Sequence, residues 1–329
     1  MTLNWAIIGT GFISNKVIDG IKRSDGSQVQ VIAGRKPDTL AKFQDEHAIP
    51  EVSTDYEAVL TDPKVDAVYI GLPNHVHHTV TGAAAKAGKA VLSEKSLTTT
   101  MNQADALMAA INDHNTFFVE GFMYLAHPFL QRFQAILMDG RLGDLRAVSG
   151  FYAADIWKFV NPMGMGTLYN LGCYPASLLQ LTVQTMCGND AFVNRRLQGV
   201  GNLGADGTVC DAACTVRFDN GILATLQSTD SYGTRNAFSV LGTKGELRFV
   251  SNPWQPIGGR SHLQWCPYDG QIEDIYVEDD FDAFYHQIKM VERHVLAGDR
   301  EAARPSPRHA DSYEIMGFLT EWEAACRSG

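Results

Sequence analysis

The 329-residue sequence predicts an α/β protein of two domains. The first is a doubly wound parallel sheet, and the second is an α/β domain with an open, largely antiparallel sheet. The chain is longer than the roughly 250 to 300 residues at which a single core stops growing. Short apolar runs alternate with amphipathic stretches up to about residue 119, and later runs follow one another directly. We place the domains at 1–121 and 122–329.

The first domain is predicted from apolar, β-branched runs that lack the alternation of a half-buried strand. Such runs are typical of parallel strands that are covered on both faces. Stretches with helical periodicity separate them and give repeated βαβ units. We expect strands at 3–8, 28–33, 66–72, 90–92 and 116–119, and helices near 13–21, 39–47, 79–87 and 102–112.

The second domain begins with helical and strand patterns and continues as consecutive strands. Residues 219–221 and 242–245 have hairpin-type turn composition. One face of an open sheet must be covered, by helices or by a second subunit, so we expect a homodimer or homotetramer built through it. The expected helices are 128–138, 167–183, 281–296 and 310–326, and the expected strands are 146–153, 191–197, 208–218, 222–228, 238–241 and 247–250.

The composition excludes several classes of partner. A formal net charge of −10 disfavours nucleic acid and anionic membranes and favours a small-molecule substrate. The first residues form neither a signal peptide nor a membrane span, so we expect a cytoplasmic protein. Six scattered cysteines predict free thiols, and Cys210 and Cys214 lack the second pair that a zinc site needs.

The segment from Gly9 to Ser14 has the glycine pattern of a dinucleotide-binding turn, between a predicted strand and a predicted helix. Gly9 permits the tight turn, and Gly11 lets backbone N–H groups approach a pyrophosphate at the helix start, where Phe12 and Ile13 follow. Ser14 replaces the third glycine, and a small residue suffices for packing there. These residues predict a Rossmann domain.

The end of the second strand predicts which dinucleotide binds. Sites that prefer NAD usually have an acidic residue there for the ribose 2′-hydroxyl, whereas this chain has Gly34, Arg35 and Lys36. The two cations suit a 2′-phosphate, so NADP(H) is the preferred cofactor. A solvated pair of surface cations, with NAD(H) as cofactor, stays open.

Three histidines follow Pro73 and Asn74, at positions 75, 77 and 78. Their place at a helix start favours hydrogen bonding on the cofactor side, or exposure, over metal binding. We expect no metal site.

Four motifs in this order resemble those of the Gfo/Idh/MocA oxidoreductase family, over essentially the whole chain. The resemblance is nearest to glucose-fructose oxidoreductase, dihydrodiol dehydrogenase and sugar-ketone reductases, because Tyr174 and the segments 120–124 and 127–128 match that subset. The four motifs are the glycine turn at 9–14, Gly71 to His77, Ala87-Gly88-Lys89 leading into Glu94-Lys95, and Leu168 to Pro175.

The resemblance implies a nicotinamide at the crevice between the domains and a reversible hydride transfer between it and a secondary alcohol or ketone, commonly on a sugar or cyclic polyol. It implies cofactor contacts from Pro73, Asn74, His77, Glu94 and Lys95.

Hydride transfer to a carbonyl needs a proton donor and a nearby positive charge. We assign Tyr174 as the acid/base and Lys95 as its orienting and electrostatic partner, and the roles can be reversed. An ammonium beside Tyr174 would lower its pKa. His127 either lines the crevice or packs at a helix start. Trp157 and Lys158 either contact the face and hydroxyls of a sugar, or Trp157 is simply buried.

Two residues depart from the family pattern. Ser96 replaces the proline that usually follows the lysine, often with a cis peptide, so we expect a trans peptide or a locally strained one. Asn170, a predicted substrate-binding residue, replaces an aspartate and cannot act as a carboxylate base. These departures leave a non-catalytic NADP(H)-binding sensor, or a structural protein on the same fold, as alternatives.

Overall fold

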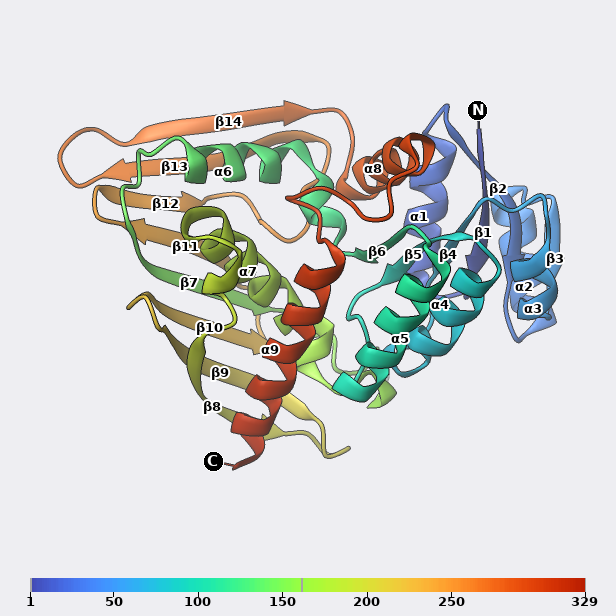
Figure 1. Cartoon of the computed structure of the whole chain (residues 1–329), viewed down its shortest axis with the longest axis horizontal. Coiled ribbons are helices and arrows are strands. Elements are labelled where there is room, and N and C mark those ends of the chain that lie inside the picture. The colour runs from blue at the N-terminus through green and yellow to red at the C-terminus, as the bar shows by residue number, and fades with distance from the viewer. Residues whose placement is uncertain (1, 161, 329) are drawn as a thin grey trace. The chain divides into compact units, whose positions relative to one another are not determined.

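A computed structural model describes residues 2–160 and 162–328. The chain divides into two compact units, coloured along the sequence in Figure 1. The first contains the described residues of Met1–Met123 and Ala283–His309, and the second those of Tyr124–Asp282 and Ala310–Gly329. The chain therefore leaves the first unit after Met123 and returns to it for the segment that begins with helix α8.

The first unit contains a six-stranded parallel sheet, which confirms the predicted doubly wound class. The strand order is β3-β2-β1-β4-β5-β6, so the order reverses between β1 and β4. Ligands of such sheets bind outside the carboxyl ends of the strands at this reversal. The strands are β1 (Leu3–Ile8), β2 (Ser27–Ala33), β3 (Glu51–Ser53), β4 (Ala67–Ile70), β5 (Ala90–Glu94) and β6 (Phe118–Gly121).

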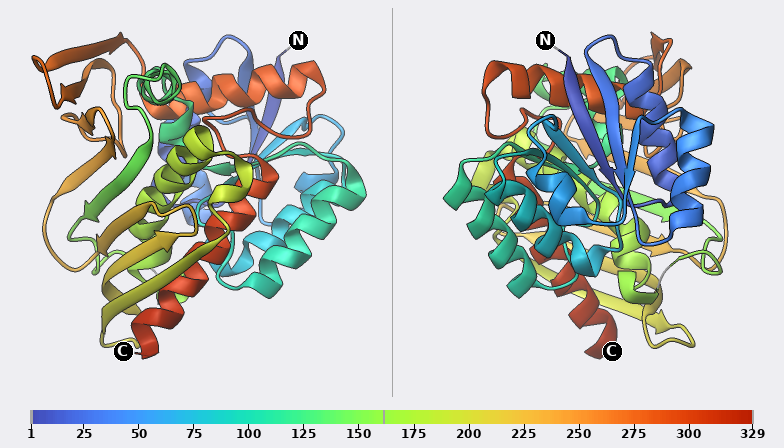
Figure 2. Two further views of the ribbon diagram at one scale, coloured as in Figure 1. Left: turned by 60° about the vertical axis from the view of Figure 1, so that its left-hand side comes forward. Right: turned by 90° about the vertical axis from the view of Figure 1, so that its right-hand side faces the viewer.

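Helices connect these strands and cover the sheet (Figure 2). Residues from Trp5 to Ile8 on β1 are fully buried, as continuous apolar runs predict for a central strand. The returning helix α8 packs against α1. The helices of this unit are α1 (Phe12–Lys22), α2 (Pro37–His47), α3 (Tyr56–Thr61), α4 (His77–Lys86), α5 (Met101–His114) and α8 (Ala283–Ala297), with a 3-10 turn η1 (Asn74–Val76).

The second unit contains an eight-stranded sheet in the order β14-β13-β12-β11-β7-β10-β9-β8. Pairing is antiparallel throughout except between β7 and β10, so the sheet is mixed and mostly antiparallel. The strands are β7 (Leu145–Ala153), β8 (Arg195–Leu203), β9 (Val209–Phe218), β10 (Leu223–Thr229), β11 (Asn236–Gly242), β12 (Gly245–Phe249), β13 (Gly259–Pro267) and β14 (Glu273–Asp279).

One face of this sheet is covered by helices of the same unit, visible on one side of it in Figure 2. Phe133 on α6 packs against Phe249, and Cys326 on α9 contacts the carbonyl of Val200 on β8. Along β10, exposed and buried residues alternate, so the opposite face of the sheet meets solvent. The helices are α6 (Pro128–Met138), α7 (Cys173–Cys187) and α9 (His309–Ser328), with turns η2 (Met123–Ala126), η3 (Pro162–Gly164), η4 (Leu168–Gly172) and η5 (Asn189–Ala191).

Several elements differ from the sequence prediction, and strand β3 and helix α3 were not predicted. Strand β8 begins at Arg195 instead of residue 191, because residues 189–191 form a 3-10 turn. Strands β13 and β14 were not predicted, since polar residues dominate their exposed positions and weaken the apolar pattern. The predicted helix 167–183 is a π-helical turn, η4, followed by α7.

None of the described helices is both long and apolar enough to cross a membrane.

Candidate active site and cofactor site

The glycine turn between β1 and α1 leaves its backbone open for a ligand. Gly9 has φ +113°, and a Cβ there would press on the carbonyl group of Gly71, with the carbonyl carbon 2.9 Å away. The hydroxyl of Ser14 donates to the carbonyl of Gly9 at 2.9 Å, so the serine that replaces the third glycine braces the turn. No side chain caps the start of α1, where Phe12 is 78% exposed. The residues therefore fit a dinucleotide pyrophosphate.

A cavity of about 330 Å³ lies beside this turn, at the carboxyl edge of the sheet. It brings together the predicted cofactor residues Gly9, Gly11, Arg35, Lys36 and Pro73. None of the described residues that line it has a carboxylate side chain. The cofactor residues predicted from the sequence do not include its other lining residues, which are Thr10, Gly34, Thr39, Tyr56, Gly71 and Leu72.

Tyr56 escaped prediction because it begins α3, a six-residue helix too short to give a periodic signal. Partial burial raises the pKa of its hydroxyl, and the nearby Arg35 guanidinium opposes that rise. At neutral pH the phenol is therefore uncharged.

Glu94 and Lys95 lie at the carboxyl end of β5, one strand away from β4. Glu94 is buried, and its carboxyl accepts a hydrogen bond from the Tyr69 hydroxyl at 3.0 Å. Burial raises the pKa of Glu94, and the Lys95 charge and the Tyr69 bond oppose that rise. The side chain of Lys95 is half-buried at the same edge.

The Lys95–Ser96 peptide bond is cis. Of the two forms expected there, a trans peptide or a locally strained one, the trans peptide was wrong. His77 lies against this segment, fully buried, with Nδ1 3.0 Å from the carbonyl oxygen of Ser96 and Nε2 2.7 Å from that of Leu72. Burial lowers the pKa of His77 to about 4 despite these carbonyl contacts. His77 therefore ties the Pro73 loop to the Lys95 loop, and any effect on the cofactor acts through those loops.

The other family motifs of this unit have different placements. Asn74 begins the turn η1 directly after Pro73, which lines the cavity. His75 and His78 are half-buried around the same helix start. Lys89 is a structural lysine, because its ammonium donates to the carbonyls of Asp62 and Val65 at 2.7 Å each.

In the second unit, Tyr174 lies at the start of α7 and is 6% exposed. Its ring packs among Tyr124, Tyr152 and Trp254, with ring centroids 5.2 to 6.3 Å away. The Tyr124 hydroxyl donates to the backbone carbonyl of Tyr174 at 3.2 Å and contacts Ser177 Oγ at 2.8 Å. These contacts fix the first turn of α7.

Asn170 lies in the π-helical turn just before α7, and its amide nitrogen donates to Asp230 Oδ2 at 2.9 Å. The backbone carbonyl of Asp230 accepts from the N–H of Trp157 at 2.7 Å. Trp157 is half-buried against Gly204, and Lys158 beside it is exposed. The structure therefore groups Asn170 with the Trp157 loop through Asp230, a residue that sequence reasoning missed.

His127 is the N-cap residue of α6 and is 1% exposed. Its Nδ1 accepts from the N–H of Phe129 at 3.1 Å, and its Nε2 lies 3.2 Å from the carbonyl oxygen of Phe281. The sequence allowed two placements for His127, at a helix start or lining the crevice. The structure shows it at a helix start.

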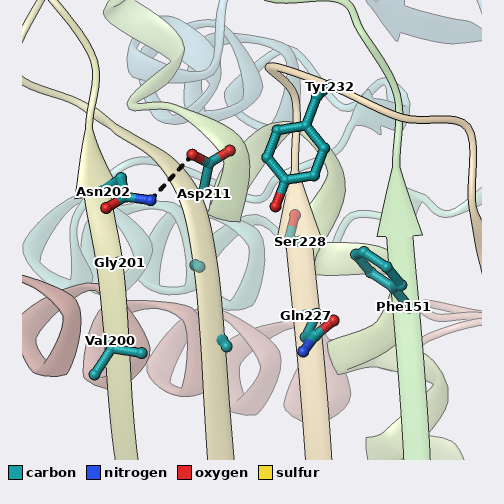
Figure 3. A pocket seen from close by; sticks show the side chains of 10 residues that line it. Phe151, Val200, Gly201, Asn202, Asp211, Gln227, Ser228 and Tyr232 are labelled. Atoms are coloured by element: carbon teal, nitrogen blue, oxygen red, sulfur yellow. Dashed lines mark hydrogen bonds between the residues drawn. The ribbon is translucent and has the colours of Figure 1, made fainter.

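A hollow of about 250 Å³ lies on the exposed sheet face, among β7, β8, β9 and β10. Figure 3 shows Tyr232 and Phe151 on one side of it and the hydrogen-bonded pair Asn202–Asp211 on the other. The Asp211 carboxylate also accepts from the hydroxyls of Thr229 and Ser231. Burial alone would raise the pKa of Asp211, but these hydrogen bonds hold it below its usual value.

A six-stranded doubly wound sheet, an open glycine turn and a cationic cavity at its carboxyl edge are typical of a dinucleotide-binding protein. Family models agree over both units. Residues 3–122 match the oxidoreductase family with an NAD-binding Rossmann fold, and residues 130–248 match the GFO/IDH/MocA C-terminal domain. The chain belongs to the Gfo/Idh/MocA family of NAD(P)-dependent oxidoreductases.

Similar proteins act on diols and sugars, as their names state. A trans-1,2-dihydrobenzene-1,2-diol dehydrogenase of Xenopus tropicalis is 26% identical over 78% of each chain. A D-xylose 1-dehydrogenase (NADP(+)) of Haloferax volcanii is 28% identical over 76% of this chain and 75% of its own. A levoglucosan dehydrogenase, solved with NADH and levoglucosan, shares the fold with a TM-score of 0.83 at 18% identity, over 100% of this chain and 98% of that one.

Proposed function

We propose that the protein transfers a hydride between NADP(H) and a secondary alcohol or ketone of a sugar, polyol or cyclic diol. The observation that carries the proposal is the cavity at the glycine turn, which is lined by Arg35 and Lys36 and lies at the same sheet edge as Lys95. The relatives named for a dihydrobenzenediol and for xylose support the substrate class.

The bound cofactor supplies or accepts the hydride. In the reducing direction, the carbonyl carbon gains the hydride, and the carbonyl oxygen takes the proton of the Tyr174 hydroxyl. The Lys95 ammonium stabilises the negative charge that develops on that oxygen. In the oxidising direction, Tyr174 accepts the proton of the alcohol. Asn170, Trp157 and Lys158 bind the hydroxyl groups and the apolar face of the substrate.

A substrate screen tests this function. Ketosugars, aldoses, anhydrosugars and cyclic diols are supplied with NADPH or NADP⁺, and the reduced nicotinamide is followed by its absorbance. We expect turnover of at least one of these classes. Tight NADPH binding without any turnover would contradict it.

The preference for NADP(H) is proposed from Arg35 and Lys36. Each charge-assisted hydrogen bond to a 2′-phosphate contributes about 1.5 to 3 kcal/mol, which is roughly tenfold or more in affinity. We expect wild-type protein to bind NADPH more tightly than NADH. The Arg35→Ala, Lys36→Ala double variant should lose affinity for NADPH alone. Equal affinities in the wild type would contradict the preference.

A non-catalytic NADP(H) sensor is the second candidate, favoured by one observation. Asn170 presents an amide, which cannot act as a carboxylate base. Such a sensor would bind NADPH with the same preference and leave the reduced nicotinamide unchanged with every substrate class of the screen.

We also propose that two copies of the chain associate through the exposed sheet face. Exposed apolar side chains on that face support it, among them Val200 on β8 and Leu223 on β10. A second copy would cover an open sheet face with a matching face, as two-fold symmetry requires.

A further inference from the structure

A second cavity, of about 500 Å³, adjoins the cofactor cavity at the glycine turn of the first unit. It lies between helices α3 and α4, which pack against each other, and we call it the α3–α4 groove. Tyr56 lines both cavities, so they meet at this residue. The described residues that line the groove are Tyr56, Glu57, Leu60 and Thr61 from α3, Thr79, Val80, Ala83 and Lys86 from α4, and Ala87.

The position of Tyr56 is fixed by the first turn of α3. The Asp55 carboxyl accepts from the N–H of Ala58 at 3.1 Å, which caps the helix. The hydroxyl of Ser53, at the end of β3, accepts from the N–H of Asp55 at 3.0 Å. Because these bonds anchor the helix start to the edge of the sheet, the backbone of Tyr56 is held at the boundary of the two cavities.

The covalent structure of NADP(H) decides which part of the cofactor reaches Tyr56. The 2′-phosphate and the adenine ring are attached to neighbouring carbons of one ribose. A 2′-phosphate bound by Arg35 and Lys36 therefore places the adenine beside these cations. Arg35 is near enough to Tyr56 for its charge to act on the phenol. The adenine thus leaves the ribose at the end of the cofactor cavity that Tyr56 lines.

The side chains of the groove suit a flat ring. Leu60 is 3% exposed and Val80 is half-buried, and together with the small Ala83 they offer apolar surface. Tyr56 is the aromatic residue among the described lining residues of either cavity, and an aromatic ring stacks on the face of a base. The groove therefore matches a heterocycle better than it matches a phosphate.

Two charged side chains lie at the rim of the groove. The Glu57 carboxylate on α3 is exposed and only accepts hydrogen bonds, and the exposed Lys86 ammonium on α4 only donates them. Adenine has a 6-amino donor beside ring-nitrogen acceptors, so it can satisfy both. Hypoxanthine has a carbonyl oxygen in place of the amino group, so it offers Glu57 an acceptor where adenine offers a donor. The rim can therefore distinguish the two bases.

We propose that the α3–α4 groove binds the adenine ring of NADP(H), with Tyr56 stacked on the ring and Glu57 accepting a hydrogen bond from the 6-amino group. Glu57 is then the residue that selects adenine. The inference rests on the proposed function, because it takes NADP(H) as the cofactor. It assigns recognition of the base to α3, a helix that contains none of the four sequence motifs.

The deamino analogue of NADPH, in which hypoxanthine replaces adenine, tests the role of Glu57. Dissociation constants are measured from the change in nicotinamide fluorescence on binding, without any substrate. We expect the wild type to bind NADPH about fivefold more tightly than the analogue, as one hydrogen bond at an open rim contributes. Glu57→Gln should lose this preference, because an amide can also donate to a carbonyl oxygen. Glu46→Gln removes the same charge from the exposed surface of α2 and should keep the preference.

Substitutions of Tyr56 test the stacking. Tyr56→Phe keeps the ring and should bind NADPH as the wild type does. Tyr56→Ala should weaken the binding of NADPH and of adenosine 2′,5′-bisphosphate roughly tenfold, as loss of an aromatic stack on a base does. Reduced nicotinamide mononucleotide lacks the adenine half, so its affinity should not change. Thermal unfolding checks that each variant is folded.

The outcomes separate this inference from the proposed function. Equal affinity of the wild type for NADPH and its deamino analogue, or a preference that survives in Glu57→Gln, would overturn the inference. Unchanged NADPH affinity in the folded Tyr56→Ala variant would overturn it as well, and either result would leave the proposed hydride transfer intact. A wild type that binds neither dinucleotide would contradict the proposed function itself.

Discussion

At the scale of single residues, five predicted cofactor residues line one cavity, namely Gly9, Gly11, Arg35, Lys36 and Pro73. Gly9 and Gly11 were predicted from the glycine pattern, Arg35 and Lys36 from the end of the second strand, and Pro73 from the family resemblance. Asp230 could not be found in this way, because its link to Asn170 spans 60 residues and no local motif encodes it. Its only signal is a polar run where the alternating pattern of β10 ends.

Replacing Gly9 tests the cofactor turn. Gly9→Ala places a methyl group against the Gly71 carbonyl at φ +113°, which costs about 1 to 3 kcal/mol in backbone strain alone. We expect a lower melting temperature and weaker NADPH binding. Gly82→Ala is the matched control, because its Cβ would meet only the Ala110 methyl at an ordinary 3.5 Å. Equal NADPH affinity in the two variants would argue against the turn as the pyrophosphate site.

His77 predicts a pH dependence of stability. Its folded pKa of about 4 lies below its ordinary value of 6.5, so the unfolded chain binds the proton more readily. The stability present at neutral pH is therefore lost as the pH falls from about 6.5 to 4, by roughly 3 kcal/mol for this group.

Denaturant unfolding of the wild type and His77→Gln at pH 7.5 and pH 4.5 measures this effect. The glutamine does not titrate, so the gap in unfolding free energy between the two proteins should shrink in acid. A gap that stays constant would mean that His77 keeps its ordinary pKa in the folded state.

At the scale of elements, continuous apolar runs predicted the central parallel strands β1, β4, β5 and β6, since nearly all of their residues are buried. Strand β3 was not predicted, because it has three residues and is mostly exposed. The short helix α3 has a weak pattern, because six residues make less than two helical turns. Strands β13 and β14 also have weak patterns, because polar side chains occupy their outer face at the edge of the sheet. The π-helical turn η4 has no sequence signature of its own. It is set by tertiary contacts, including Thr167 Oγ1 to Ser228 Oγ at 2.8 Å.

The start of α7 depends on the Tyr124 hydroxyl. Tyr124→Phe removes its contacts with the Tyr174 carbonyl and Ser177, so we expect a loss of about 1 kcal/mol in unfolding free energy. In an active enzyme, kcat should fall more than KM rises, because Tyr174 loses its support. Tyr268→Phe is the control, since Tyr268 is an exposed residue whose hydroxyl donates to the backbone carbonyl of Gly242 at the end of β11. Identical kinetics in the two variants would contradict the idea that the Tyr124 hydroxyl positions Tyr174 at the start of α7.

At the scale of the whole molecule, the class of both sheets was predicted correctly, including the largely antiparallel second sheet. The parallel pairing of β7 with β10 was not predicted, because it joins strands separated by a helix and two further strands.

Association through the sheet face has a direct test. Light scattering coupled to size-exclusion chromatography should give a molecular mass that is a multiple of 36.1 kDa for the wild type. Val200→Glu with Leu223→Glu places charges on the exposed face without touching the core, and we expect it to give the monomer mass. An unchanged mass in that folded variant would locate any association elsewhere.

The central claim is that, beside a bound NADP(H), Tyr174 transfers the proton and Lys95 stabilises the negative charge on the substrate oxygen. A single-turnover experiment with NADPH-loaded enzyme and the best substrate of the screen measures it most directly. We expect Tyr174→Phe and Lys95→Ala each to slow nicotinamide oxidation by about 10² or more, as loss of a general acid or of a charge-stabilising group does, with NADPH still bound. Oxidation at the wild-type rate in both variants would contradict the account.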